Sequence, residues 1–476
     1  MALIKDLFLS CRKGDLERIR LLVEEKEVEV NIRDCWDSTP LYYACLCGHL
    51  ETVQYLLQNG ARCEAHTFDG ERCLYGALSP EIRHLLKTYK VATSQTIRRE
   101  LYFEFLRRLL ETGEFSDVSF TVHGISFLAH RCVLAARSEY FEEALAGKWQ
   151  DRSTVYINHK DVNPDAFRAV LNYIYTGQLE TQVNQVDDVK RLAAQCRLKT
   201  LQARLEEMVN KAHFFQSTKP GTHVTTVVVE SPDCLELQMD LSILAEVAAP
   251  AQLRHWLAGP ELLGYEPRDW FGDLVFSVQG TQFLCHKAFF CTRSDYFRAL
   301  VRDPLGELET EEAGPSFTSF PIIYLRQFST SVFLYILYYV YQESVELEVH
   351  SVYDVLMAAD LCLLPGLKRQ CGTFMAGFLD AGNVVGAVRT ARMFDLPRLE
   401  DQCCQFIADH LEQMLERPDL HELICEDAAE VTGREDVDSI DVIDNVRYHL
   451  TAQSIEEAQD KLELIDDLLH TLNLDA

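Results

Sequence analysis

One segment of the chain occurs twice, 156 residues apart, and this duplication limits the possible folds more than any other feature. Residues 115–141 and 271–297 are identical at 12 of 27 positions without a gap. Further along, matching residues such as Phe167 and Phe333 stand 166 apart. The second copy therefore holds ten more residues, which we place in the acidic, turn-rich stretch 303–315. Because the repeat is far longer than a short motif, we expect the chain to contain one whole domain twice.

Each copy opens with a pattern typical of a hairpin followed by a helix. Apolar and polar residues alternate over 118–122, which is the period of a half-buried strand. His123 and Gly124 suit a tight turn, because glycine tolerates a positive φ. Ser138 is a suitable N-cap for the helix that carries Tyr140 and Phe141. The duplicated unit is therefore a mixed α/β domain.

A shorter period precedes the duplicated domain. Residues 34–44 return as 67–77 at a spacing of 33, and Gly14-Asp15-Leu16-Glu17 returns as Gly48-His49-Leu50-Glu51. This stretch resembles ankyrin repeats, although Arg72-Cys73 replaces the Thr-Pro pair that begins a repeat's first helix. Two repeats and an eroded third are fewer than such arrays need for a continuous core. We expect the array to lean on the domain that follows.

Four motifs make each copy resemble a BTB/POZ domain. They are F-x-D-V-x-F-x-V from Phe115, A-H-R or C-H-K around His130 and His286, R-S-x-Y-F from Arg137, and F-x-x-x-L-x-Y-x-Y from Phe167. An ankyrin array followed by two such domains resembles the ankyrin repeat and BTB/POZ domain-containing protein 1 family. Residues 383–403 look like the opening of a BACK domain, a helical module that commonly follows BTB domains in ubiquitin-ligase adaptors.

We therefore predict an α+β fold that is predominantly helical. Its parts are the ankyrin repeats over 1–90, the first BTB/POZ domain over 97–210, a linker over 211–266, the second BTB/POZ domain over 267–378, and a BACK-like helical region with an acidic tail over 379–476. Within the linker, residues 224–230 have strand character, and residues 240–257 have helical spacing broken by Pro250.

The charge of the chain, 45 − 74 = −29, argues against a nucleic-acid partner. The excess of acidic over basic residues lies in the second half of the chain. Residues 1–210 carry 30 acidic and 27 basic residues, residues 211–420 carry 28 acidic and 15 basic, and residues 421–476 carry 16 acidic and 3 basic. The sixteen cysteines show no zinc-ligand spacing, and many stand among apolar residues. The longest apolar run is too short to cross a membrane. We expect a reduced, cytoplasmic protein that binds neither nucleic acid nor membrane.

The sequence offers no catalytic, cofactor-binding or metal-binding motif. It has no P-loop, nucleophile elbow or zinc-binding HExxH, and His421-Glu422 lacks the second histidine. His130 and His286 recur in both copies where a strand leads into a helix, and we interpret them as packed structural residues. Cys132 is matched by Ala288, so a duplicated Cys/His nucleophile is unsupported. We predict a protein that is not an enzyme and needs no cofactor.

Family resemblance assigns a charged pocket to each copy. It places Asp117 and Arg131, and likewise Asp273 and Lys287, in the pocket of BTB dimers. The alternative is one ion pair within each copy, worth about 0–1 kcal/mol if exposed.

BTB adaptors that bind cullin-3 carry a hydrophobic-x-Glu triplet after the Ser-x-Tyr-Phe helix. Resemblance to these adaptors therefore implies a cullin-3 docking site at this place in each copy. The second copy has Leu305-Gly-Glu307 at this place, and the first has Trp149-Gln-Asp151. An apolar anchor beside a charge is a common way to concentrate binding energy. We favour the second copy as the cullin site.

Residues 98–111 form a predicted helix with a broad apolar face that includes Leu101, Phe105 and Leu109. In the family such a helix forms the dimer seam, and packing onto the ankyrin remnant is the alternative. The two BTB copies pair either within one chain, imitating a homodimer, or between chains.

These features favour a non-catalytic adaptor, the substrate-recognition subunit of a cullin-3 RING ubiquitin ligase, whose ankyrin repeats bind the substrate. The alternatives are a BTB-mediated scaffold or assembly protein that is independent of cullin, and a corepressor-type regulator, which the missing DNA-binding module disfavours.

Overall fold

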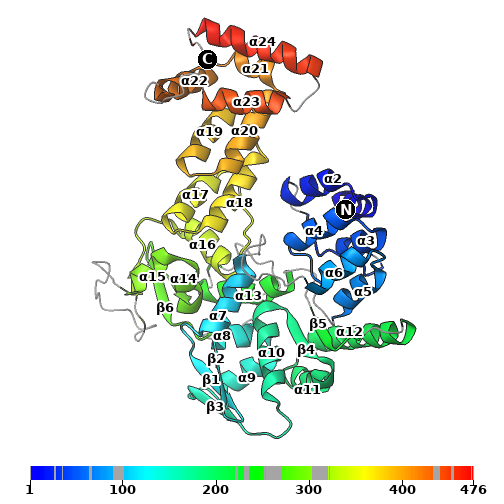
Figure 1. Cartoon of the computed structure of the whole chain (residues 1–476). Coiled ribbons are helices and arrows are strands. Elements are labelled where there is room, and N and C mark those ends of the chain that lie inside the picture. The colour runs from blue at the N-terminus through cyan, green and yellow to red at the C-terminus, as the bar shows by residue number, and fades with distance from the viewer. Residues whose placement is uncertain are drawn as a thin grey trace. The chain divides into compact units, whose positions relative to one another are not determined.

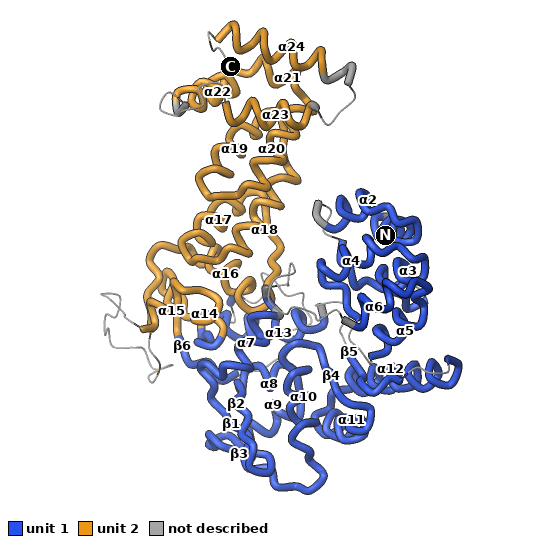
Figure 2. The backbone as a smooth tube through the Cα atoms, in the orientation of Figure 1, with its two compact units in different colours: residues 1–274, 284–288 blue, residues 275–283, 289–476 orange. Residues whose placement is uncertain are grey.

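The structure is a computed structural model, and it divides into two compact units that we describe separately (Figure 2). The first unit comprises residues 1–274 and 284–288, and the second comprises 275–283 and 289–476. The structure describes residues 2–25, 28–34, 36–63, 67–88, 101–219, 223–229, 235–250, 252–253, 270–302, 320, 322–431, 440–451, 455–472 and 474.

The first unit begins with an array of short helices joined by turns (Figure 1). These are α1 (Ala2–Lys13), α2 (Leu16–Arg20) with a π-helical continuation (Leu21–Glu25), α3 (Pro40–Cys47), α4 (Leu50–Gln58), α5 (Phe68–Gly76) and α6 (Pro80–Thr88). Thr39 caps α3 by accepting the N–H of Tyr42, and Pro40 occupies the first helical position. Gly48 ends α3 at φ +81°, a conformation that favours glycine. The array has a core of its own, in which Leu41, Val53 and Leu56 are buried.

The eroded third repeat begins its helix earlier than the sequence alignment implies. Without a Thr-Pro pair at 72–73, Thr67 acts as the cap and accepts the N–H of Gly70, so α5 already begins at Phe68. Arg72 consequently lies inside α5. Its guanidinium donates to the carbonyl oxygen of Asp37 at 2.6 Å and to the Ser38 hydroxyl at 2.9 Å. This arginine ties the third repeat to the turn of the second.

The ankyrin array packs against the next domain through helix α12 (Lys199–Thr218), as the sequence predicts. The ring of Phe215 lies 5.6 Å from that of Phe68 and 6.2 Å from that of Tyr75. Lys211 forms an ion pair with Asp37 at 2.7 Å. The third repeat therefore rests on a helix that belongs to the first BTB-like copy.

The first copy follows the predicted order of hairpin and helices. Its elements are α7 (Leu101–Thr112), β1 (Val118–Val122), β2 (Ile125–Ala129), α8 (Arg131–Arg137), α9 (Glu139–Ala146), β3 (Thr154–Ile157), α10 (Pro164–Thr176), β4 (Leu179–Gln182), a 3-10 turn (Val183–Gln185), α11 (Val186–Gln195) and α12. Strand β1 is central, antiparallel to β2 and parallel to β3. Ser138 caps α9 through the N–H of Phe141, which confirms the predicted cap.

Two elements of the intervening segment also pack in the first unit. Strand β5 (Thr226–Val229) pairs antiparallel with β4, and helix α13 (Leu235–Ala248) packs against α8. The strand predicted within 224–230 is confirmed over Thr226–Val229. The predicted helix begins five residues earlier than expected and ends before Pro250.

The second copy repeats the arrangement of the first. Its elements are β6 (Leu274–Val278), β7 (Thr281–Cys285), α14 (Lys287–Arg293), α15 (Asp295–Arg302), β8 (Ile322–Tyr324), α16 (Thr330–Gln342), α17 (Val352–Leu361) and α18 (Pro365–Ala376). Strand β6 is central and parallel to β8. Phe115 and Phe271 share a positive φ, of 59° and 62°. The predicted insertion at 303–315 lies outside the described residues.

Helices complete the second unit: α19 (Val384–Met393), α20 (Pro397–Asp409), α21 (Leu411–Leu415), α22 (Pro418–Val431), α23 (Asp441–Thr451) and α24 (Ile455–Thr471). Arg392 joins α19 to α20 and α22 through Glu400 at 2.6 Å and Asp427 at 2.5 Å. Ile465, Leu468 and Leu469 of α24 are buried. The acidic tail is thus helical where it is described, and the predominantly helical α+β class is confirmed.

Within the described residues, the structure has no helix of the length and apolar character that a bilayer crossing requires.

Replacing Phe215 with alanine should loosen the ankyrin array from α12. The lost ring contacts with Phe68 and Tyr75 are worth on the order of 1–2 kcal/mol for a half-buried ring. We expect backbone amides of residues 67–76 to exchange their hydrogens about tenfold faster, measured by mass spectrometry. Phe214→Ala is the matched control, because the neighbouring Phe214 is 72% exposed. Equal exchange in both variants would contradict this interface.

Candidate functional site

Each copy has a charged junction where the hairpin leads into its helix. Asp117 accepts the backbone N–H of Arg131 at 2.8 Å, and Asp273 accepts that of Lys287 at 2.8 Å. Each carboxylate thereby satisfies an N–H that the start of a helix leaves open. Desolvation of the Asp117 carboxylate and the nearby charge of Asp273 raise its pKa, against the lowering effect of the Arg131 N–H.

The Arg131 side chain holds the loop after α9. Its guanidinium donates to the carbonyl oxygens of Gln150 at 2.9 Å and Arg152 at 2.6 Å. It also lies 5.7 Å from the centre of the Phe271 ring. Within the first unit, the structure therefore brings the start of the second copy to the charged junction of the first. Lys287 contributes its backbone N–H to the corresponding junction of the second copy.

The paired histidines are held inside the protein. His130 is 1% exposed, and its Nε2 lies 2.8 Å from the carbonyl oxygen of Glu114. Because a carbonyl oxygen only accepts, Nε2 carries the hydrogen, and Nδ1 accepts from the Tyr175 hydroxyl at 2.8 Å. The His130 N–H donates to the same hydroxyl. Burial lowers the pKa of both His130 and His286, so the geometry supports a structural role.

The proposed anchor of the first copy is part of its core. Trp149 is 9% exposed, and its ring lies 5.7 Å from Phe120 and 6.3 Å from Phe141. In this arrangement the indole is not a surface anchor, while Asp151 is exposed. In the second copy Phe276 instead contacts Phe290, at 4.9 Å. The candidates Leu305 and Glu307 lie outside the described residues.

The predicted seam helix α7 packs against α10. Leu109 is buried and Phe105 half-buried, with its ring 5.9 Å from that of Tyr102. Leu101 begins α7, and its side chain lies outside the described part. Leu109 is buried within the single chain, and the role of this face as a seam stays a prediction.

Helix α17 of the second copy presents a row of exposed apolar side chains, which we call the α17 patch. Tyr353, Met357 and Leu361 are 43%, 46% and 45% exposed, and Leu363 just beyond them is 57% exposed. Their spacing of four residues places the first three on one face of the helix. Exposed apolar rows of this kind mark interaction surfaces.

The first copy has no such patch at the equivalent positions, which lie 166 residues earlier. They hold Asp187, Arg191, Gln195 and Arg197. Sequence reasoning missed the α17 patch, although this comparison between copies could have found it. The patch adjoins α15, because the Ser294 hydroxyl at the start of α15 donates to the carbonyl oxygen of Cys362 at 2.7 Å. The segment that carries Leu305 follows α15 directly in the chain.

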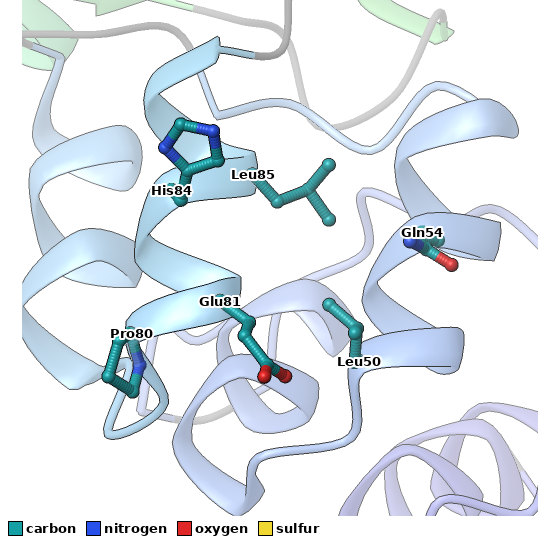
Figure 3. A pocket seen from close by; sticks show the side chains of 6 residues that line it. All are labelled: Leu50, Gln54, Pro80, Glu81, His84 and Leu85. Atoms are coloured by element: carbon teal, nitrogen blue, oxygen red, sulfur yellow. The ribbon is translucent and has the colours of Figure 1, made fainter.

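A groove of about 440 Å³ lies between α4 and α6 of the ankyrin array. In Figure 3, Leu50 of α4 and Leu85 of α6 point into it, with Glu81 and His84 on the α6 side. The groove is largely apolar with one carboxylate, so it can accept an apolar side chain of a protein partner.

The described residues contain no group of three or more His, Cys, Asp or Glu side chains placed to hold a metal. Burial raises the pKa of several thiols to about 12, namely those of Cys11, Cys196, Cys371, Cys403 and Cys404. These thiols are protonated near neutral pH and behave as small apolar side chains.

Comparison with known families agrees with the two repeats. Residues 106–213 and 266–379 each match the BTB/POZ domain, and residues 6–67 match ankyrin repeats. Both domain types are protein-interaction modules without catalytic residues.

Two curated relatives align along nearly the whole chain. BTB/POZ domain-containing protein 3 of Schizosaccharomyces pombe is 27% identical, over 99% of this chain and 90% of its own. Ankyrin repeat-containing protein YIL001W of Saccharomyces cerevisiae is 26% identical, over 97% and 92%. Kelch-like protein 40 of Xenopus laevis is 27% identical over 35% of this chain and 27% of its own.

Replacing Tyr175 with phenylalanine should destabilise the first copy. It removes the partner of the His130 N–H and of Nδ1, and unsatisfied buried polar groups cost about 1–3 kcal/mol. We expect the melting temperature to fall by about 2–8 °C in calorimetry. Tyr156→Phe is the control, because Tyr156 of β3 is 70% exposed. An equal fall in both variants would contradict the network.

Proposed function

We propose that this chain, which combines ankyrin repeats with two BTB/POZ domains, is a non-catalytic adaptor that brings a bound protein to a cullin-3 RING ubiquitin ligase. In this role the chain supplies proximity, and the ligase supplies the chemistry. We place the adaptor in the cytoplasm.

The α17 patch is the observation that carries this proposal. A cullin-binding surface needs exposed apolar side chains, and the second copy has them on α17, beside the start of α15. The triplet Leu305-Gly-Glu307 that resembles the cullin motif follows α15 in the chain. In the first copy the corresponding anchor Trp149 is buried. These differences favour the second BTB/POZ domain as the cullin site.

The ankyrin repeats are the proposed substrate platform. Part of the third repeat already packs on α12, through Phe68 and Tyr75 against Phe215. This packing leaves the groove between α4 and α6, together with the first two repeats, for a substrate. The acidity of the second half should attract basic surfaces of partner proteins.

Charged substitutions in the α17 patch should weaken cullin-3 binding. An aspartate at Met357 leaves a charge without a partner in an apolar contact, so Met357→Asp should raise the dissociation constant at least about tenfold. Binding of purified full-length chain to cullin-3 is measured by interferometry. The double variant Leu305→Asp, Glu307→Ala should show a loss of similar size.

Arg191→Asp is the matched control, because Arg191 occupies the position of Met357 in the first copy. It should change the dissociation constant less than about twofold. Unchanged binding in both second-copy variants would contradict the adaptor proposal and support a scaffold that is independent of cullin. An equal loss in the control would contradict the assignment to the second copy.

Added salt should slow the association of the chain with its protein partner. Salt screens the electrostatic attraction between the acidic second half and a basic partner surface. The association rate should therefore fall by about tenfold between 50 mM and 500 mM salt, and the dissociation rate should change less. Stopped-flow or surface-based kinetics with cullin-3 measure both rates. An association rate that is independent of salt would refute the electrostatic contribution.

A further inference from the structure

The segment between the two BTB/POZ domains closes an edge of the first one. Strand β5 pairs with β4 in the register Leu179–Val229 to Gln182–Thr226. Val227 and Val229 of β5 are buried. Without β5, β4 would present unpaired N–H and C=O groups, which invite pairing with another chain.

Helix α13 covers the neighbouring surface of the first domain. It packs against α8 and buries Leu241, Leu244 and Ala245. The side chain of Arg137, at the end of α8, is only 3% exposed. It donates to the carbonyl oxygen of Ile174 at 3.1 Å and pairs with Asp240 of α13. A buried guanidinium needs an acid, and α13 provides it.

The second domain supplies this acid by itself. Arg293, the counterpart of Arg137, donates to the carbonyl oxygens of Tyr339 and Val340 and pairs with Glu343 of its own copy. Glu343 adopts φ +65°, where the first copy has Gly177 at φ +68°. Gly177 has no carboxylate to pair with Arg137, so Asp240 of α13 supplies the carboxylate that Glu343 supplies in the second copy. The first domain is thus adapted to receive α13, and the second is not.

The second domain protects the equivalent edge by charge. The counterpart of β4 is Val345–Glu348, which is in no strand pairing among the described residues. Glu346 and Glu348 alternate with Val345 and Leu347 along it. Antiparallel pairing of two such edges would bring like charges together, which is destabilising. Charged edge residues are a known protection against association.

We propose that β5 and α13 form an intrachain clasp that closes the β4 edge and the α8 surface of the first BTB/POZ domain, so that these surfaces do not pair with another chain. The occupants of these surfaces are the chain's own β5 (Thr226–Val229) and α13 (Leu235–Ala248). The competing arrangement is a domain-swapped dimer, in which β5 and α13 of each chain make the same contacts with the other chain. This inference is independent of cullin binding.

An engineered disulfide distinguishes the two arrangements. Glu180 and Val228 face each other in the register of β4 and β5, and directly opposed residues are close enough for a disulfide. The full-length variant Glu180→Cys, Val228→Cys is made with four cysteines changed to serine: Cys47 and Cys425, which are exposed, and Cys35 and Cys234, which lie outside the described residues. After mild oxidation, nonreducing electrophoresis and light scattering measure whether the bond lies within or between chains.

We expect an intrachain disulfide, so that the denatured, nonreduced protein runs at the 54.5 kDa of one chain. A disulfide-linked dimer would overturn the proposal. Glu180→Cys alone is the control and should form neither the intrachain bond nor a linked dimer.

Asp240→Ala tests the clasp without cysteines. Loss of the acid leaves Arg137 buried and unpaired, so β4 should exchange its amide hydrogens about tenfold faster or more. The molecular mass of this variant in light scattering should then rise with protein concentration, because the exposed β4 edge can pair with another chain. Glu343→Ala is the matched control, because it removes the acid of the second domain and leaves the clasp intact. Unchanged exchange in Asp240→Ala, or an equal effect of Glu343→Ala on β4, would overturn the proposal.

Discussion

In each BTB/POZ domain a carboxylate joins the hairpin to the helix that follows, through the bonds of Asp117 to the Arg131 N–H and of Asp273 to the Lys287 N–H. The histidine beside each basic residue is buried and bonded to a main-chain carbonyl oxygen. Since the hairpin and the helix are fixed to each other at this junction, the aromatic core can pack between them. Phe120 then meets Phe167 at 5.6 Å, and Phe276 meets Phe333 at 5.6 Å.

Around this shared junction the contacts of the two copies differ. Arg131 clamps the loop after α9, and Trp149 fills the core of the first copy. The first copy also receives β5 and α13 from the intervening segment, which cover its edge and its α8 surface. The second copy supplies its own acid at Glu343 and keeps an exposed apolar row on α17. The differences lie in the core and at the surface, while the bond between the aspartate and the helix N–H is retained.

Local features of the fold could be predicted because neighbouring residues decide them. The alternation over 118–122 and the cap at Ser138 involve only residues close in sequence, and both are confirmed. The burial of Trp149 could not be predicted, because it depends on Phe120, which comes 29 positions earlier in the chain. The start of α5 at Phe68 does not follow from the repeat spacing, because Thr67 caps the helix in place of the eroded Thr-Pro pair.

The sequence alone determined that this chain carries an ankyrin array and one domain twice. Hydrophobic period, capping residues and repeat spacing depend only on the order of residues along the chain. Only the tertiary structure decided which surfaces remain available. Arg137 and Asp240 are 103 positions apart, and their contact closes the first domain. The exposed fractions of Tyr353, Met357 and Leu361 likewise depend on which other elements pack against α17. Availability depends on what else packs nearby, and that is a property of the whole folded chain.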